Sequence, residues 1–271
     1  MKSLVRRLLR VGFNYDPSFC DMHEDGHARQ AAQEYLRHLR PAIRQHVGTQ
    51  PLLMLDAGCQ AGRLLIPLAE DGHRLIGIDT SGFALRLAAA HARARNLRVR
   101  LHRGNIARVR RWVKPQSLDV VICTEVLYLC RDHRALLALL VESVRPGGLI
   151  CVSHRPLAHY LASAVRHGRP ELIPGLVRRG EGPSPDGEYH NWQTPQELEA
   201  LYATLGLTIL GCHPVDYYAE HAVDFDAIRD PAARAMLESM RTGADSKVRV
   251  PGYLLVIAQR PSPPVSGTAG A

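Results

Sequence analysis

From residue 52 onward, short apolar segments alternate with longer segments in which apolar residues recur every three or four positions. The short segments predict strands and the longer ones predict helices. We expect strands at 52–57, 74–79, 99–102, 118–124, 149–154, near 207–212 and over the final segment GYLLVIAQR, with helices at 62–72, 81–96 and 132–144 between them. This alternation predicts an α/β fold, a doubly wound sheet with helices on both faces.

The rest of the chain predicts a lead-in, two insertions and a tail around this sheet. Residues 1–48 form the lead-in, with a helix at 28–46, and residues 49–260 form the main domain. A Gly- and Pro-rich segment at about 156–193 predicts a lid. Thr194 and Pro195 begin a helix, a second insertion follows at about 214–248, and 261–271 is expected to be a disordered tail.

Composition narrows the class of protein only slightly. The chain has 271 residues, 46% of them hydrophobic and 22% charged, and no apolar run approaches the roughly 18 residues of a membrane span. Its six cysteines contain no C-x-x-C pair, which indicates reduced thiols and a cytoplasmic protein. The net charge of +8 fits an acidic substrate or a nucleic acid, but the arginines are scattered.

The segment LDAGCQAGRL, residues 55–64, predicts a ligand-binding turn after the first strand. Gly58 and Gly62 allow close approach of a ligand, but the G-x-x-x-G spacing does not fit the pyrophosphate of a dinucleotide. Asp56 suits a cationic amine, and Asp79 at the end of the second strand suits the two hydroxyls of a ribose. An amine combined with an adenosine suggests S-adenosylmethionine.

Five motifs in this order resemble the class I S-adenosylmethionine-dependent methyltransferases of the small-molecule type, which include the ubiquinone and menaquinone methyltransferases. The motifs are LDAGCQAGRL, GIDTS, HRGNI, LDVVICTEVLYL and VRPGGLICVSHR. The resemblance implies a Rossmann-like seven-stranded sheet whose last strand is antiparallel. It also implies that Gly58 and Gly62 line the methionine moiety, that Asp79 holds the ribose and that Asn105 lies near the adenine.

Two positions depart from the family pattern: Asn105 stands where Asp is frequent, and Gln60 replaces a common glycine. An amide can still pair with adenine, and Gln60 could contact the amino acid end of the cofactor. The predicted cofactor-binding residues are Asp56, Gly58, Cys59, Gln60, Gly62, Asp79, Thr80, Asn105, Ile106 and Glu125.

Candidates for the methyl acceptor lie after the fourth and fifth strands and in the lid. His154 and His190 are candidate general bases, and Tyr15, Tyr128, Tyr189 and Trp192 are candidate acceptor contacts. Each of these side chains has an equally ordinary role in packing or capping. Cys20, His23 and His27 have a spacing that can bind a metal, but no second set completes the site, so we expect no metal.

These observations predict methyl transfer from S-adenosylmethionine to O, N or C of a small metabolite by a monomer or homodimer. An RNA methyltransferase is the second reading, although no signature for base amino groups or cytosine C5 is found after the fourth strand. A non-catalytic binding or regulatory protein on the same fold is the third, and Asp79 argues against it because a scaffold needs no contact with a ribose.

Overall fold

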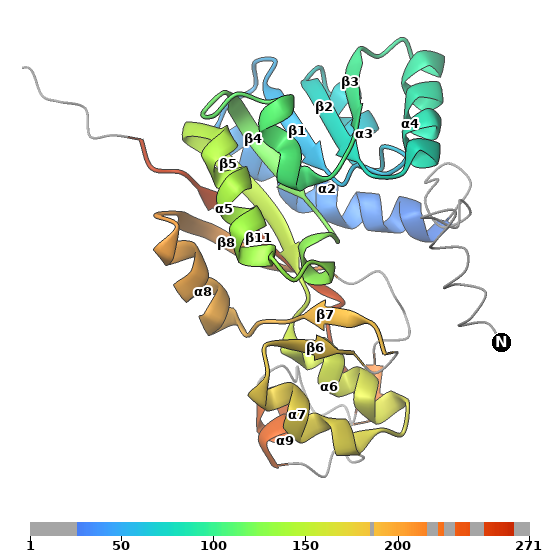
Figure 1. Cartoon of the computed structure of the whole chain (residues 1–271), viewed down its shortest axis with the longest axis vertical. Coiled ribbons are helices and arrows are strands. Elements are labelled where there is room, and N and C mark those ends of the chain that lie inside the picture. The colour runs from blue at the N-terminus through green and yellow to red at the C-terminus, as the bar shows by residue number, and fades with distance from the viewer. Residues whose placement is uncertain (1–25, 185–186, 216–221, 225–230, 239–246, 263–271) are drawn as a thin grey trace, which may run out of the picture.

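A single mixed sheet of seven strands forms the centre of the molecule in the computed structural model, which describes residues 26–184, 187–215, 222–224, 231–238 and 247–262 (Figure 1). The strand order is β3-β2-β1-β4-β5-β11-β8. The strands are β1 (Leu53–Ala57), β2 (Arg74–Asp79), β3 (Val99–Arg103), β4 (Leu118–Cys123), β5 (Val144–His154), β8 (Thr208–Val215) and β11 (Tyr253–Gln259). Strands β1 to β5 are parallel, and β11 is antiparallel to β5 and β8. The expected doubly wound sheet with an antiparallel last strand is confirmed.

Helices cover both faces of this sheet because neighbouring strand residues point to opposite sides. Leu55 packs in one hydrophobic core with α5 and α8, whereas Met54 packs in the other with α2 and α3. The helices are α2 (Gly26–His46), α3 (Leu65–Glu70), α4 (Gly82–Ala94), α5 (His133–Ser143) and α8 (Pro195–Thr204), with short 3-10 turns η2 (Ile106–Arg111) and η3 (Leu127–Leu129). Within the described residues, no helix combines the length and apolar character that crossing a bilayer requires.

The segment expected to be an irregular lid contains regular structure. It forms α6 (Leu157–Arg166), η4 (Pro170–Leu172), α7 (Ile173–Arg178) and a hairpin of β6 (Glu181–Pro183) with β7 (Tyr189–Asn191). Leu157, Leu161 and Ala164 are spaced as on one helix face and are buried in a third hydrophobic core with Leu176 and Trp192. The Gly and Pro residues hid this pattern, because some lie inside short elements, such as Pro174 and Gly175 in α7, and others lie in the connections.

The described parts of the second insertion pack against the first. They are β9 (Ala222–Asp224), α9 (Pro231–Glu238) and β10 (Lys247–Arg249), and α9 contacts α6 and α7 at one end of the molecule (Figure 1). The two insertions therefore form one small unit beside the sheet. All of the lead-in before Gly26 and residues 263–271 of the expected tail lie outside the described residues.

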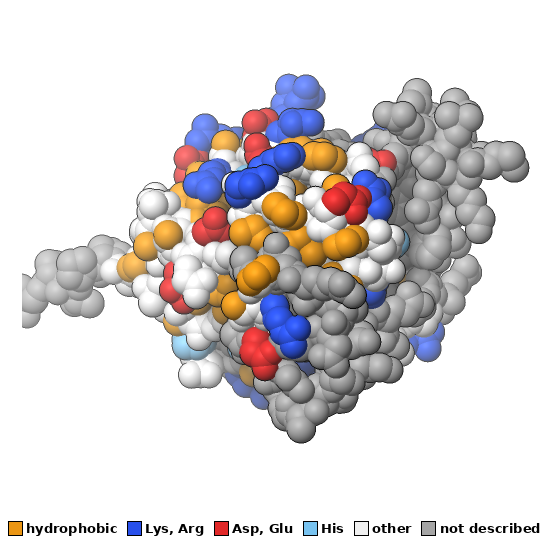
Figure 2. Space-filling view, turned by 90° about the horizontal axis from the view of Figure 1, so that it is seen from below, with side chains coloured by type: hydrophobic (Ala, Val, Ile, Leu, Met, Phe, Trp, Pro, Cys, Tyr) orange, Lys and Arg blue, Asp and Glu red, His pale blue; other side chains and the backbone are white. Residues whose placement is uncertain are grey.

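Figure 2 looks onto this end of the molecule. Hydrophobic side chains gather near the centre of the view, and Lys and Arg side chains are most numerous above them, with others scattered lower down. Val177 of α7 is 39% exposed, which is ordinary for a surface hydrophobic residue. This surface therefore gives no functional assignment.

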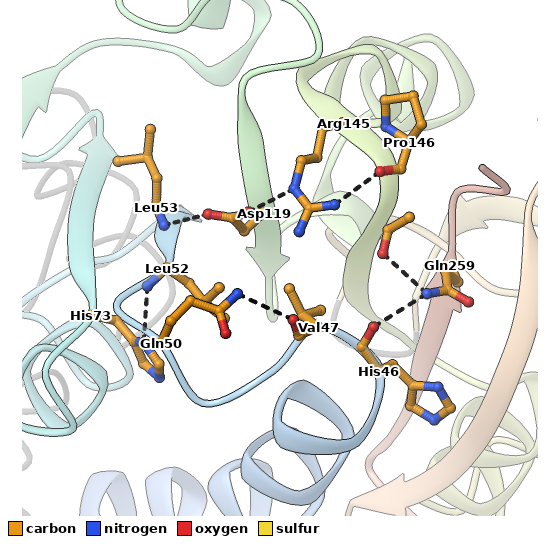
Figure 3. A network of polar contacts seen from close by, with 11 residues as sticks. His46, Val47, Gln50, Leu52, Leu53, His73, Asp119, Arg145, Pro146 and Gln259 are labelled. Carbon is orange, nitrogen blue, oxygen red and sulfur yellow. Dashed lines mark hydrogen bonds and ion pairs between the residues drawn. The ribbon is translucent and has the colours of Figure 1, made fainter. Parts of the chain in front are cut away.

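A polar network joins the amino ends of the central strands, at the edge of the sheet opposite the predicted site (Figure 3). The Asp119 carboxylate accepts the Leu53 backbone N–H at 2.7 Å and the Arg145 Nε–H at 2.7 Å. These three residues lie at the starts of β4, β1 and β5, so one carboxylate connects three neighbouring strands. Nearby, Gln259 of β11 donates to the Gly147 carbonyl at 3.0 Å.

We expect Asp119→Ala to lower the free energy of unfolding by about 2 kcal/mol, because it removes two hydrogen bonds to a charged group that is partly shielded from water. Chemical denaturation measures this change. Glu142→Ala is the matched control, because its exposed ion pair with Arg110 contributes roughly 0–1 kcal/mol. Equal losses in the two variants would contradict a joining role for Asp119.

Candidate active site

The turn after β1 is bonded to the end of β2. The backbone N–H groups of Gly58 and Cys59 donate to the Ile78 carbonyl at 2.8 and 3.2 Å. Gly58 has φ of +88°, and a Cβ atom there would lie 2.3 Å from a methyl carbon of Val126 in the segment after β4. Glycine is therefore required at this position, because the Val126 side chain fills the space that a Cβ atom would need.

Asp79 ends β2 beside this turn. One carboxylate oxygen accepts the Gln60 backbone N–H at 2.9 Å, and the other accepts the Ser81 backbone N–H at 2.7 Å. Burial raises the pKa of Asp79, and these backbone hydrogen bonds oppose the rise. Each oxygen keeps a second lone pair, so the carboxylate can still accept hydrogen bonds from a pair of hydroxyls.

Two residues of the site hold the left-handed conformation that glycine usually adopts. Gln60 has φ of +47° and Glu125, just after β4, has φ of +60°. The Glu125 backbone N–H donates to the Ser153 hydroxyl at 2.6 Å, and its carboxylate pairs with Arg63 at 2.8 Å. The turn thus keeps a glycine-like path although Gln60 replaces the glycine of the family pattern.

Asp56 and Cys59 lie under the turn and are only 3% exposed each. Burial raises the pKa of Asp56 to about 7, while nearby Arg63 and the Leu65 backbone N–H lower it. Burial also raises the pKa of the Cys59 thiol. These surroundings are typical of residues that shape the turn from below, and direct contact of either with a ligand stays a prediction.

The remaining predicted cofactor residues lie along the neighbouring strand ends. The Gly104 backbone N–H donates to the Asp79 carbonyl at 2.9 Å, which brings Asn105 alongside the acid. The exposed Asn105 side chain accepts the Ala107 N–H through its oxygen at 2.8 Å, so its amide nitrogen faces outward from this cap. Thr80 is exposed and Ile106 is buried.

His154 has the surroundings of a packing residue. It ends β5, is 3% exposed, and its Nε2 lies 3.0 Å from the Tyr202 hydroxyl, with which it hydrogen-bonds. Burial, together with the nearby His133, lowers the pKa of His154 to about 3. An imidazole that is buried, neutral and already bonded is poorly suited to accept a proton from an acceptor, so we give His154 no part in the chemistry.

His190 lies instead in a group of rings that we call the acceptor-side cluster. Tyr128 lies 5.0 Å from His190 and 5.7 Å from Tyr253 between ring centroids. Tyr160 lies 5.7 Å from His190 and 4.9 Å from Trp192. The cluster therefore joins the segment after β4, the start of β11 and the first insertion.

Tyr189 does not join this cluster. Alternation along β7 places it on the other face of the hairpin from His190. Its hydroxyl donates to Glu181 at 2.7 Å, and the guanidinium of Arg131 lies 4.2 Å from its ring centroid. Tyr15 lies outside the described residues.

The sequence interpretation missed three residues of this region, namely Arg155, Tyr160 and Tyr253. Arg155 follows His154 directly in the motif VRPGGLICVSHR, so its position at the end of a strand was readable. Tyr160 and Tyr253 carried no such signal, because α6 was not expected and the start of an antiparallel strand reaches the site only through the fold.

The residues after β1, β2 and β3 fit an adenosine carrying an amino acid. Gly58 is only partly buried in the turn, Asp79 offers two acceptor oxygens and Asn105 offers an amide. In contrast, no group of three or more metal-ligating side chains occurs in the described part of the chain. Cys20, His23 and the His27 side chain lie outside it.

Comparisons with known proteins agree with this geometry. Residues 54–148 match the family model described as a methyltransferase domain. A ubiquinone biosynthesis O-methyltransferase from Methylobacterium sp. (strain 4-46) is 28% identical over 222 residues, which cover 77% of this chain and 84% of the relative. The corresponding protein of Cupriavidus pinatubonensis is 30% identical over 60% of this chain and 63% of its own length.

Solved structures share the fold at low identity. Magnesium protoporphyrin IX methyltransferase from Synechocystis PCC 6803 superposes with a TM-score of 0.61 at 18% identity, covering 96% of this chain and all of that one. The fold is thus that of an α/β methyltransferase. In sequence and in fold, the chain is similar to the class I S-adenosylmethionine-dependent methyltransferases.

We expect Asp79→Ala to weaken the binding of S-adenosylhomocysteine at least about tenfold. The ribose hydroxyls and the Gln60 backbone N–H would both lose the carboxylate that accepts their hydrogen bonds. Calorimetric titration measures the affinity. Asp71→Ala is the matched control, since Asp71 pairs with Arg40 at the surface. Unchanged affinity in folded Asp79→Ala would reject the ribose assignment.

Proposed function

We propose that the protein transfers a methyl group from S-adenosylmethionine to O, N or C of a small metabolite held at the acceptor-side cluster. The observation that carries this proposal is the path of the segment after β4. Val126 lies against Gly58 of the cofactor turn, and Tyr128, two residues further on, belongs to the cluster. Cofactor and acceptor would therefore meet across one short segment.

The names of related proteins support a small acceptor. The relatives are named for O-methylation in ubiquinone biosynthesis. A structural neighbour from Burkholderia thailandensis, with a TM-score of 0.57, 17% identity and coverage of 96% of this chain and 89% of that one, is named 1,6-didemethyltoxoflavin-N1-methyltransferase. The five cysteines that the structure describes are free thiols, which is typical of a reducing compartment, so we expect the protein to act in the cytoplasm. We also expect a monomer or a homodimer.

In this proposal the chain contributes mainly placement. Bound S-adenosylmethionine supplies a methyl group on a positively charged sulfur, which is already activated for transfer. Gly58, Gly62, Asp79 and Asn105 would hold the nucleoside and its amino acid end. The cluster would orient the acceptor and exclude water, and proximity of this kind lowers the barrier of a two-substrate reaction by several kcal/mol.

His190 is the proposed proton acceptor where the nucleophile must lose a proton. It lies in the cluster against Tyr128 and Tyr160, whereas His154 bonds to Tyr202 inside the core. We expect His190→Gln to lower kcat at least about tenfold with little change in the free energy of unfolding. His154→Gln should instead lower that free energy by about 1–3 kcal/mol. Steady-state kinetics and denaturation of both variants check this, and the reverse pattern would exchange the two roles.

A screen for methyl acceptors tests the function itself. Purified protein with radiolabelled S-adenosylmethionine is offered hydroxylated aromatic compounds, heteroaromatic amines and total tRNA in parallel. We expect label in a small compound and none in tRNA. Label confined to tRNA would favour the RNA methyltransferase reading, and cofactor binding without transfer to any acceptor would favour a regulatory protein.

A further inference from the structure

Arg155 lies at the end of β5 within the acceptor-side cluster. Its guanidinium carbon lies 4.8 Å from the centroid of the Tyr128 ring and 4.3 Å from that of the Tyr253 ring. The side chain is partly buried between the two rings. A cation thus stands where the methyl acceptor is proposed to bind.

Every hydrogen-bond partner of Arg155 that the structure describes is neutral. The guanidinium donates to the Tyr253 hydroxyl at 2.6 Å and to Nε2 of His159, which must be neutral to accept. The Tyr253 hydroxyl in turn donates to the Tyr128 hydroxyl at 3.5 Å. The buried Nε–H of Arg155 has no partner among the described residues.

Within the described residues, no carboxylate oxygen lies within 4.0 Å of Arg155. Other arginines of this fold differ, since Arg63 pairs with Glu125 and Arg145 pairs with Asp119. Burial lowers the pKa of Arg155 but the surrounding tyrosine hydroxyls raise it more, so the side chain stays cationic. The two tyrosine faces help to hold this cation, which still has no carboxylate beside it and keeps an Nε–H without a partner among the described residues.

We propose that Arg155 binds a carboxylate of a planar acceptor, which rests on the proposed function because it concerns the acceptor of the same reaction. The planar guanidinium fork matches a carboxylate and can bind it through two hydrogen bonds. The rings of Tyr128, Tyr253, Tyr160 and His190 suit a flat conjugated body beside that group. The acceptor would therefore be an aromatic or heteroaromatic acid.

The test measures preference for an acid over its neutral amide. Benzoate, 4-hydroxybenzoate and 1-hydroxy-2-naphthoate, each beside its amide, are titrated into the full chain saturated with S-adenosylhomocysteine. We expect at least one acid to bind ten or more times tighter than its amide. Arg155→Gln should reduce this ratio to within about twofold of one, and Arg155→Lys should keep part of it.

Arg131→Gln is the matched control, because Arg131 also stacks on a tyrosine, Tyr189, but outside the cluster. This variant should keep the full preference. S-adenosylhomocysteine affinity, measured separately, should be unchanged in all three variants, so failure of the cofactor site is distinguished from failure of this proposal.

Three results would overturn the assignment. They are a wild-type protein that prefers no acid of the panel, a folded Arg155→Gln protein that keeps the preference, and phenyl phosphate binding tighter than every carboxylate. If Arg155→Gln does not fold, Arg155→Lys decides, because a purely structural cation would leave the ratio of acid to amide unchanged.

Discussion

Three backbone N–H groups in the turn after β1 donate hydrogen bonds to the last two residues of β2. The arrangement of the candidate active site depends on these hydrogen bonds. Gly58 and Cys59 donate to the Ile78 carbonyl, and Gln60 donates to the Asp79 carboxylate. The same hydrogen bonds fix the conformation of the turn and orient the Asp79 carboxylate, which we propose binds the ribose. The turn and the Asp79 carboxylate, which we propose as the two halves of the cofactor site, therefore take their positions together.

The sheet was largely predictable from the sequence, because strands buried on both faces leave continuous apolar segments between helical periods. The start of β5 was not predictable, because the segment Pro146-Gly147-Gly148 indicates a turn. In the structure, β5 begins at Val144, which pairs with Leu118, and the register of the two strands shifts after this pair. Tertiary pairing outweighed local preference there. The proposed cofactor residues could be named from the sequence because they follow consecutive strands along the chain, and their binding role stays a prediction.

The acceptor side was predictable only in part, because its rings come from distant segments. Tyr128 and Tyr253 are 125 positions apart and meet only because β11 inserts beside β5. Nor could the sequence separate Tyr189 from His190, since that depends on which face of the β6–β7 hairpin lies toward η3. Backbone strain left no sign in the sequence either. Gln60 and Glu125 hold a positive φ, which costs conformational free energy and persists where the surrounding contacts fix the backbone, as is typical of functional sites.

The place of β11 also bears on how the protein is made. In chain order β11 follows β8, yet in the sheet it lies between β5 and β8. During synthesis, at roughly 5–20 residues per second, β5 and β8 emerge first and have no bond to each other. The edge of β5 stays open until β11 arrives, and an open edge is a template for pairing with other chains. The nascent chain can thus complete strands β1 to β5, where we propose the cofactor binds, before β11 brings Tyr253 to the proposed acceptor side.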